Sequence, residues 1–180
     1  MEKLNQADRE LSKLTDKDVR IVYLPPATVA SIYLIGNKPE DRASMILREF
    51  IKTTNLPCVK PDFRHYGFNH PNGTNDDDHG YEIWVTIPED MELTPPFIKK
   101  QYEGGLYAAH TIIFGDFEKW NWLWAWVEGN EKFELNLGDA ACMDGLIEEH
   151  YNYFNQYNLK NFDKDNFQMD LMIPVKEREK

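Results

Sequence analysis

Apolar residues in the first half of the chain follow two periods, which together predict two pairs of strands separated by one helix. The alternating segments predict strands over Val19–Leu24, Thr28–Ile35, Asp62–Asn69 and Tyr81–Ile87. Between the second and third strands, Pro39 and Glu40 are typical of the first turn of a helix. The helical spacing predicts that this helix buries Met45, Ile46, Phe50 and Ile51.

The second half of the chain repeats this plan. Strand-like segments are followed by a run that begins at Asp116, in the place of the first-half helix. Three pairs of segments match in the same order: Ala30–Glu40 with Ala109–Lys119, Arg64–Phe68 with Glu149–Tyr153, and Tyr81–Pro88 with Phe167–Pro174. Each match is weak alone, but chance rarely supplies three in order, so we interpret the chain as an internal duplication.

The duplication predicts an α+β fold. Two βαββ units, over about residues 19–96 and 97–176, are expected to join edge to edge in a curved antiparallel sheet. Residues 1–18 would form a polar N-terminal extension. An antiparallel sheet can leave one of its faces uncovered. We therefore expect two helices on one face of this sheet and a ligand cavity on the other.

Four of the five tryptophans stand at alternate positions of a single run: Trp120, Trp122, Trp124 and Trp126. Alternation is typical of a strand, but the repeat places this run opposite the first-half helix, so we predict a helix over Trp120–Glu128. At about 100° per residue, Trp120 and Trp124 would share one side, and Trp122 and Trp126 the other. One pair is expected to anchor the helix to the sheet and the other to face the cavity rim or solvent.

The charge and composition exclude several classes of function. With a net charge of −11, the sequence lacks the basic stripe of a nucleic-acid-binding protein, so no direct nucleic-acid binding is expected. The same charge disfavours an anionic membrane surface, and no apolar stretch is long enough to span a bilayer. Two isolated cysteines, Cys58 and Cys142, are typical of a reduced, cytoplasmic protein.

Two neighbouring acidic residues are the first candidates for chemistry. If their segment is a strand, Glu148 and Glu149 point to opposite faces, one exposed and one inward. A carboxylate inside an aromatic pocket can pair with a cation, or serve as a general base with a raised pKa. The structural alternative is a pair of solvated glutamates.

Further candidates follow from alternation and from the aromatic content. Glu82 and Trp84 share one face of their strand, which resembles the lining of a polar and aromatic pocket. Tyr66 and Tyr107 belong to a set of nine tyrosines that suits an adaptable cavity. His110 is added to the candidate lining, although a partly buried histidine with satisfied hydrogen bonds is the simpler interpretation.

No metal or cofactor is expected. The segment His65–Gly80 is rich in histidine and aspartate, but it lacks the spacing of a calcium loop or a zinc site. We interpret it as a long, turn-rich loop. The sequence also lacks a nucleophile elbow, a phosphate-binding loop and a dinucleotide fingerprint.

Four segments taken together resemble the GyrI-like family: Tyr81–Leu93, Tyr102–Glu128, Leu146–Phe154 and Leu171–Lys176. This family is the small-molecule (effector-binding) domain of many multidrug-responsive bacterial transcription regulators, and it is related to the SOUL heme-binding-like fold. The resemblance covers about residues 19–176 and implies a duplicated βαββ fold with a cavity between the halves. Because the sequence contains no DNA-binding module, a stand-alone member is expected.

In the GyrI-like family, the glutamate of a short segment, an aromatic or aliphatic residue followed by Glu-x-Tyr, projects into an aromatic cavity. There it pairs with cationic, lipophilic drugs. The matching segment here is Ile147–His150, so the resemblance assigns this role to Glu148. His150 stands where a tyrosine is common in the family.

We therefore predict a pocket protein that binds hydrophobic or cationic small molecules and protects against drugs or toxins. The predicted ligand-binding residues are Glu148, Glu82, Trp84, Trp120, Trp124, Tyr107, His110 and Tyr66. One alternative is a hydrolase of strained, cyclopropane-containing compounds with Glu148 as the general base, as in some stand-alone relatives. Another is a protein-interaction module of the gyrase-inhibitor type.

Overall fold

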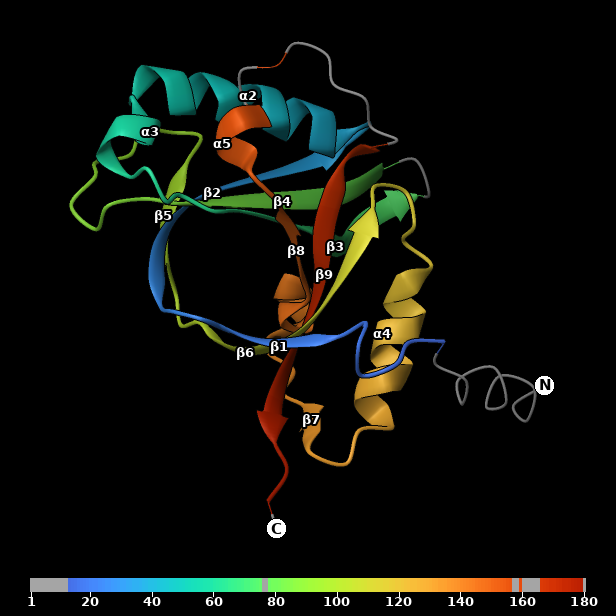
Figure 1. Ribbon diagram of the computed structural model, residues 1–180. Helices are drawn as coiled ribbons and strands as arrows, with labels where there is room; N and C mark the ends of the chain where they lie inside the picture. The colour runs from blue at the N-terminus through green and yellow to red at the C-terminus, as the bar shows by residue number, and fades with distance from the viewer. Residues whose placement is uncertain (1–12, 76–77, 157–158, 160–165, 180) are drawn as a thin grey trace.

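The computed structural model describes residues 13–75, 78–156, 159 and 166–179 (Figure 1). The strands are β1 (Arg20–Leu24), β2 (Ala27–Gly36), β3 (His65–Asn75), β4 (Asp78–Thr86), β5 (Ile98–Tyr102), β6 (Gly105–Ile113), β7 (Phe133–Leu135), β8 (Ile147–His150) and β9 (Gln168–Glu177). The helices are α2 (Pro39–Thr53), α3 (Leu56–Val59), α4 (Lys119–Glu128), α5 (Tyr153–Gln156) and the short 3-10 helix η1 (Ala140–Gly145). This content confirms the predicted α+β class.

The described strands form one antiparallel sheet in the order β1-β6-β9-β8-β3-β4-β2-β5, with β7 paired to β9. The elements β2–α2–β3–β4 and β6–α4–β8–β9 follow the same plan and meet where β3 pairs with β8. The first strand of each half pairs with the other half, because β1 lies beside β6 and β5 beside β2. The duplicated, edge-to-edge sheet expected from the sequence is therefore confirmed.

The two main helices pack on the outer side of the curled sheet, each over its own half (Figure 1). Helix α2 buries Ala43, Leu47 and Ile51 against β2 and β4, whereas α4 buries Leu123 and Val127 against β6 and β9. Each buried leucine of this kind contributes about 1.5–3 kcal/mol of burial free energy. The side chains that alternate with these form a third apolar cluster on the inner face, which includes Leu24, Val29, Tyr66, Tyr102, Tyr107 and Met172.

Helix α2 differs in detail from its prediction. Its fully buried positions recur every four residues at Ala43, Leu47 and Ile51, so they form one stripe. Met45 lies two positions from this stripe, about 200° around the helix, and its side chain is 72% exposed. The expectation that Met45 is buried is therefore wrong, while Ile46 and Phe50 pack at the edge of the core.

The predicted loop His65–Gly80 is also wrong, because most of it is a β-hairpin. Strands β3 and β4 remain paired from His65 opposite Val85 to Asn75 opposite Asp78, with a register shift after His70. Residues 76 and 77 lie outside the described residues. The ladder joins backbone groups, so it can continue through a run of polar side chains that resembles a loop in the sequence.

Two matched glycines have the same backbone conformation at the end of corresponding strands. Gly36 has a φ of 115° and ends β2, and Gly115 has a φ of 107° shortly after β6. Side chains disfavour this region, whereas glycine enters it without steric penalty. The match of these glycines in the sequence repeat thus has a structural cause, the turn that directs each strand toward its helix.

Candidate functional site

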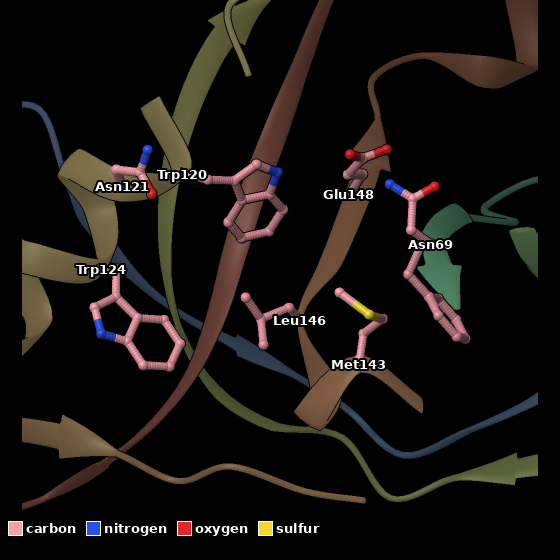
Figure 2. Close-up of a pocket in the computed structure, with 8 residues that line it drawn as sticks. Asn69, Trp120, Asn121, Trp124, Met143, Leu146 and Glu148 are labelled. Carbon is pink, nitrogen blue, oxygen red and sulfur yellow. The ribbon is translucent and has the colours of Figure 1, made fainter. Parts of the chain in front are cut away.

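A cavity of about 870 Å³ lies between α2 and α4, at the junction of β3 and β8. Its aromatic lining consists of Tyr81, Phe114, Phe117, Trp120 and Phe167. Its polar and charged lining includes Glu40, Asp41, Arg48, His65, Asn69, Glu148 and His150. A smaller cavity of about 320 Å³ extends toward η1 and shares Asn69, Trp120 and Glu148 (Figure 2).

The cavity lies on the helix-bearing face of the sheet, which corrects the expectation that it lies on the free face. Helices α2 and α4 pack over separate halves of the sheet, and they leave a gap at the junction between the halves. The free face is instead filled by the third apolar cluster, inside the curl. The spacing of the helices therefore positions the cavity.

Glu148 is the central acidic group of this cavity. Its residue is 9% exposed, and its carboxylate accepts hydrogen bonds from the Tyr81 hydroxyl, at 3.3 Å, and from the Trp120 indole. Burial, with a smaller contribution from the charge of Glu40, raises the pKa of the Glu148 carboxyl to about 7. The two hydrogen bonds oppose this rise. Among the described residues, no lysine, arginine or histidine forms an ion pair with Glu148.

Gly67 makes the hydrogen bond from Tyr81 possible. It lies on β3 directly opposite Glu148 on β8. A Cβ atom at this position would lie 2.2 Å from the Tyr81 hydroxyl oxygen, well inside van der Waals contact. The phenol ring therefore crosses β3 over the glycine to reach the carboxylate of Glu148.

The tryptophan run is helical, as predicted, and its two sides have different surroundings. Trp120 and Trp124 line the cavities beside Glu148, and Figure 2 shows the Trp120 indole nitrogen directed toward that carboxylate. Trp122 and Trp126 contact the N-terminal segment, through a cation–π contact with Lys13 and an indole hydrogen bond to Asp16. The deepest contacts with the sheet come from neither pair but from Leu123 and Val127.

Glu149 is buried as well, which corrects the expectation that one of the two glutamates is exposed. It is 8% exposed and points to the opposite face from Glu148. The Arg64 guanidinium binds it in a bidentate pair, with Nε to Oε1 at 2.6 Å and Nη2 to Oε2 at 2.5 Å. The half-buried Arg64 compensates the Glu149 charge, whereas the Glu148 carboxylate faces the cavity.

Glu82 and Trp84 do not share the cavity of Glu148, because they lie on the inner face of the sheet. The Glu82 carboxylate accepts hydrogen bonds from Ser31 at 2.5 Å, His70 at 2.7 Å, Lys100 at 2.5 Å and the Trp84 indole. Burial alone would raise the pKa of Glu82, but these hydrogen bonds outweigh it and hold the pKa below its usual value. The two oxygens of the Glu82 carboxylate thus accept their hydrogen bonds from groups of the protein itself.

The remaining predicted residues also lie away from the cavity lining. Tyr66 and Tyr107 belong to the third apolar cluster on the inner face. His110 is 8% exposed in β6, and its Nδ1 donates to the backbone carbonyl of Asp18 at 2.8 Å. Of the eight predicted residues, the structure brings Glu148, Trp120 and Trp124 together around the cavities.

Several cavity residues were not singled out from the sequence. His65 on β3 and His150 on β8 stand next to the paired residues Tyr66 and Glu149, and their ring centroids lie 4.3 Å apart. Burial lowers the pKa of both imidazoles, to about 4 for His150. Their one sequence signal is that the repeat matches His65 with His150, which places both at the junction of the halves. Tyr81 was known only as an apolar strand position.

Two broader features complete the description. No helix within the described residues is long and apolar enough to cross a bilayer. Over the same ranges, no cluster of three or more histidine, cysteine, aspartate or glutamate side chains has the arrangement of a metal site.

Solved structures with a similar fold include the EcmrR C-terminal domain, at a TM-score of 0.64 and 12% identity, covering 89% of this chain and 98% of that one. A hydrolase encoded by lin2189 from Listeria innocua is similar at a TM-score of 0.62 and 9% identity, covering 91% of this chain and 94% of that one. No curated protein matches the chain in sequence.

These identities are low and establish the fold alone, but a family model matches nearly the whole described domain. The match spans residues 20–175 and carries the description integron-associated effector binding protein, Cass2, a GyrI-like group. An effector-binding family indicates a small-molecule partner, in agreement with a large, partly aromatic cavity. The chain belongs to the GyrI-like family of integron-associated effector binding proteins.

Proposed function

We propose that this protein binds hydrophobic cations in the cavity between α2 and α4, with Glu148 as the group that selects positive charge. The observation that carries the proposal is a buried carboxylate in an aromatic cavity without a basic partner among the described residues. Tyr81 and Trp120 donate to that carboxylate and orient it, while the aromatic walls offer area for stacking. Trp124 extends this apolar area into the smaller cavity.

The electrostatics of the cavity favour a cation over a neutral ligand. With its pKa raised to about 7, Glu148 is about half protonated at neutral pH while the cavity holds no cation. A bound positive charge favours the ionised form, so binding would release a proton and strengthen as the pH rises through 7. Glu40 and Asp41 add negative charge to the lining, and among the described lining residues Arg48 is the arginine that opposes them.

The test compares two ions of the same shape and opposite charge, tetraphenylphosphonium and tetraphenylborate. At pH 8 the cation should bind and the anion should bind far more weakly. Glu148→Gln should weaken the cation by about 10- to 100-fold, because a carboxylate and a cation about 5 Å apart interact by up to about 3 kcal/mol at an effective dielectric constant of about 20.

The matched control is Glu89→Gln, which removes an exposed carboxylate from a turn outside the cavity lining. It should leave the affinity for tetraphenylphosphonium unchanged in calorimetry. If the Glu148 and Glu89 variants bind the cation equally well, Glu148 does not select charge and the proposal fails.

In a cell, we propose that such binding protects against toxic lipophilic cations by sequestration. The affinity and the amount of protein together would set how much of the compound remains free. Expression of the wild-type chain should raise the concentration of a lipophilic cation needed to stop growth, and expression of the Glu148→Gln variant should not.

One observation favours a second candidate function, hydrolysis. A carboxyl with a pKa of about 7 that faces a cavity is well matched to accept a proton from water near neutral pH, and the Tyr81 hydroxyl beside it could position that water. The similar fold of the Listeria innocua hydrolase is compatible with this chemistry, although it is a likeness of fold alone. Turnover of a strained cyclopropane substrate that disappears in Glu148→Gln while binding persists would favour hydrolysis over sequestration.

A further inference from the structure

Asn69 is a polar residue of the cavity that cation binding at Glu148 leaves without a role. It lies on β3, it is exposed, and it lines both the larger and the smaller cavity. Asparagine is depleted in β-strands, so the strand itself gives no reason for this residue. Its amide is therefore available to whatever occupies the cavity.

The hydrogen-bonding groups of Asn69 are free within the described part of the chain. No described residue forms a hydrogen bond with its amide, which offers one carbonyl acceptor and two N–H donors. Its polar neighbours are engaged, because Tyr81 and Trp120 donate to Glu148. Arg48 donates to a backbone carbonyl at 2.8 Å. In an open cavity water can satisfy the Asn69 amide, and a ligand that displaces this water must replace its hydrogen bonds.

Asn69 and Glu148 lie on the same face of neighbouring strands. Gly67 stands directly opposite Glu148 where β3 pairs with β8, and Asn69 is two residues further along β3. Such diagonal neighbours are about 7–8 Å apart at their Cα atoms, within reach of long side chains. Figure 2 shows the Asn69 amide directed toward the Glu148 carboxylate. A small charged group in the cavity can therefore contact both side chains at once.

The two acceptors select the chemistry of that charged group. The ionised Glu148 carboxylate only accepts hydrogen bonds, and the Asn69 amide can turn about its last torsion to present its oxygen. A protonated primary or secondary amine carries at least one N–H donor for each acceptor. A quaternary ammonium or phosphonium ion carries the same charge, but it leaves the amide without a partner once it has displaced the water.

We propose that Asn69 is a specificity-determining residue, which shifts the preference of the cavity toward protonated primary and secondary amines and away from quaternary cations. One N–H of the ammonium group would donate to Glu148, and a second N–H would donate to the Asn69 carbonyl oxygen. The aromatic substituents of the amine would lie against the aromatic walls of the cavity. This inference rests on the proposed binding of cations at Glu148.

The test compares dibenzylammonium with dibenzyldimethylammonium by calorimetry at pH 7, where both ligands are cations with the same aryl groups. The ratio of their affinities, amine over quaternary ion, should fall by about 5- to 30-fold in Asn69→Leu, because one hydrogen bond from a charged donor is lost. Leucine has a similar size, so the affinity for the quaternary ion should change little. The control Asn136→Leu makes the same change in an exposed residue directly after β7, outside the cavity lining, and should keep the wild-type ratio.

An affinity ratio that Asn69→Leu leaves unchanged would overturn the inference, and so would an equal fall in Asn136→Leu. If the Asn69 variant does not fold, the side-chain carbonyl carbon resonance of wild-type Asn69 decides the matter. Dibenzylammonium should shift this resonance more than the quaternary ion does, and equal shifts would refute the role. Failure of both ligands to bind the wild-type protein would instead refute the proposed function.

Discussion

Replacing Glu148 with glutamine should make the protein more stable above neutral pH, although it removes a group of the proposed binding site. The carboxyl titrates near 4.5 when unfolded and at about 7 in the folded protein, because the fold buries it. Since the folded pKa is the higher one, the stability that the protein gains from keeping this carboxyl protonated is fully present below pH 4.5. It is lost as the pH rises through 7.

The magnitude follows from the size of this shift. A difference of about 2.5 pH units corresponds to about 3.4 kcal/mol at high pH, at about 1.36 kcal/mol for each unit. About 1.4 kcal/mol of this is already lost at pH 5.5, so about 2 kcal/mol separates pH 5.5 from pH 8.5. The glutamine variant has no carboxyl to ionise, so its stability relative to wild type should rise by about 2 kcal/mol over that interval.

The assay is urea unfolding of the wild-type and Glu148→Gln proteins at both pH values, with the free energies of unfolding compared pairwise. Glu82→Gln serves as the contrast, because the carboxylate of Glu82 is held by four donors and its pKa is lowered. That variant should be less stable than wild type at both pH values. Parallel changes of the wild-type and Glu148→Gln proteins between pH 5.5 and 8.5 would show that the fold does not raise the pKa of Glu148.

Three further predictions test the surroundings of this carboxyl. Gly67→Ala should displace the phenol that donates to Glu148 and so raise the pKa of Glu148 further, visible in the carboxyl carbon resonance during an NMR titration. Trp120→Phe should weaken tetraphenylphosphonium about 3- to 10-fold by calorimetry, since one indole hydrogen bond is lost, whereas Trp122→Phe on the other side of α4 should have little effect. Between pH 7 and pH 5, the His150→Phe variant should lose about 2 kcal/mol less stability than the wild type, because the folded pKa of His150, about 4, lies below the unfolded 6.5. Equal acid sensitivity of the two proteins in urea unfolding would contradict this.

The sequence was sufficient for the fold because the evidence for it is repeated along the chain. The tryptophan run alternates like a strand, and only its match to the first-half helix identified it as helical. The exchange of β1 and β5 between the halves was not foreseen, since strand pairing depends on long-range contacts that no single segment carries. The exposed Met45 was misplaced because an apolar residue near a helical stripe resembles a member of it.

The site was only partly predictable, for a related reason. Alternation correctly grouped Glu82 with Trp84 and separated Glu148 from Glu149, but it could not show which face of the sheet contains the cavity. That choice depends on the gap between α2 and α4, a property of helix packing. The ring contact of His65 with His150 arises where β3 meets β8, so it too became visible only in the folded chain.

The most direct test of Glu148 as the cation-binding group is the number of protons released when tetraphenylphosphonium binds. This cation carries no titratable group, so calorimetry in buffers with different ionisation enthalpies counts protons that come from the protein. At pH 7 the wild-type protein should release about half a proton per cation, because a carboxyl with a pKa of about 7 is half protonated before binding and ionised afterwards. The Glu148→Gln variant should release none. Cation binding without proton release in the wild type, or with the same release in both proteins, would contradict the role of Glu148.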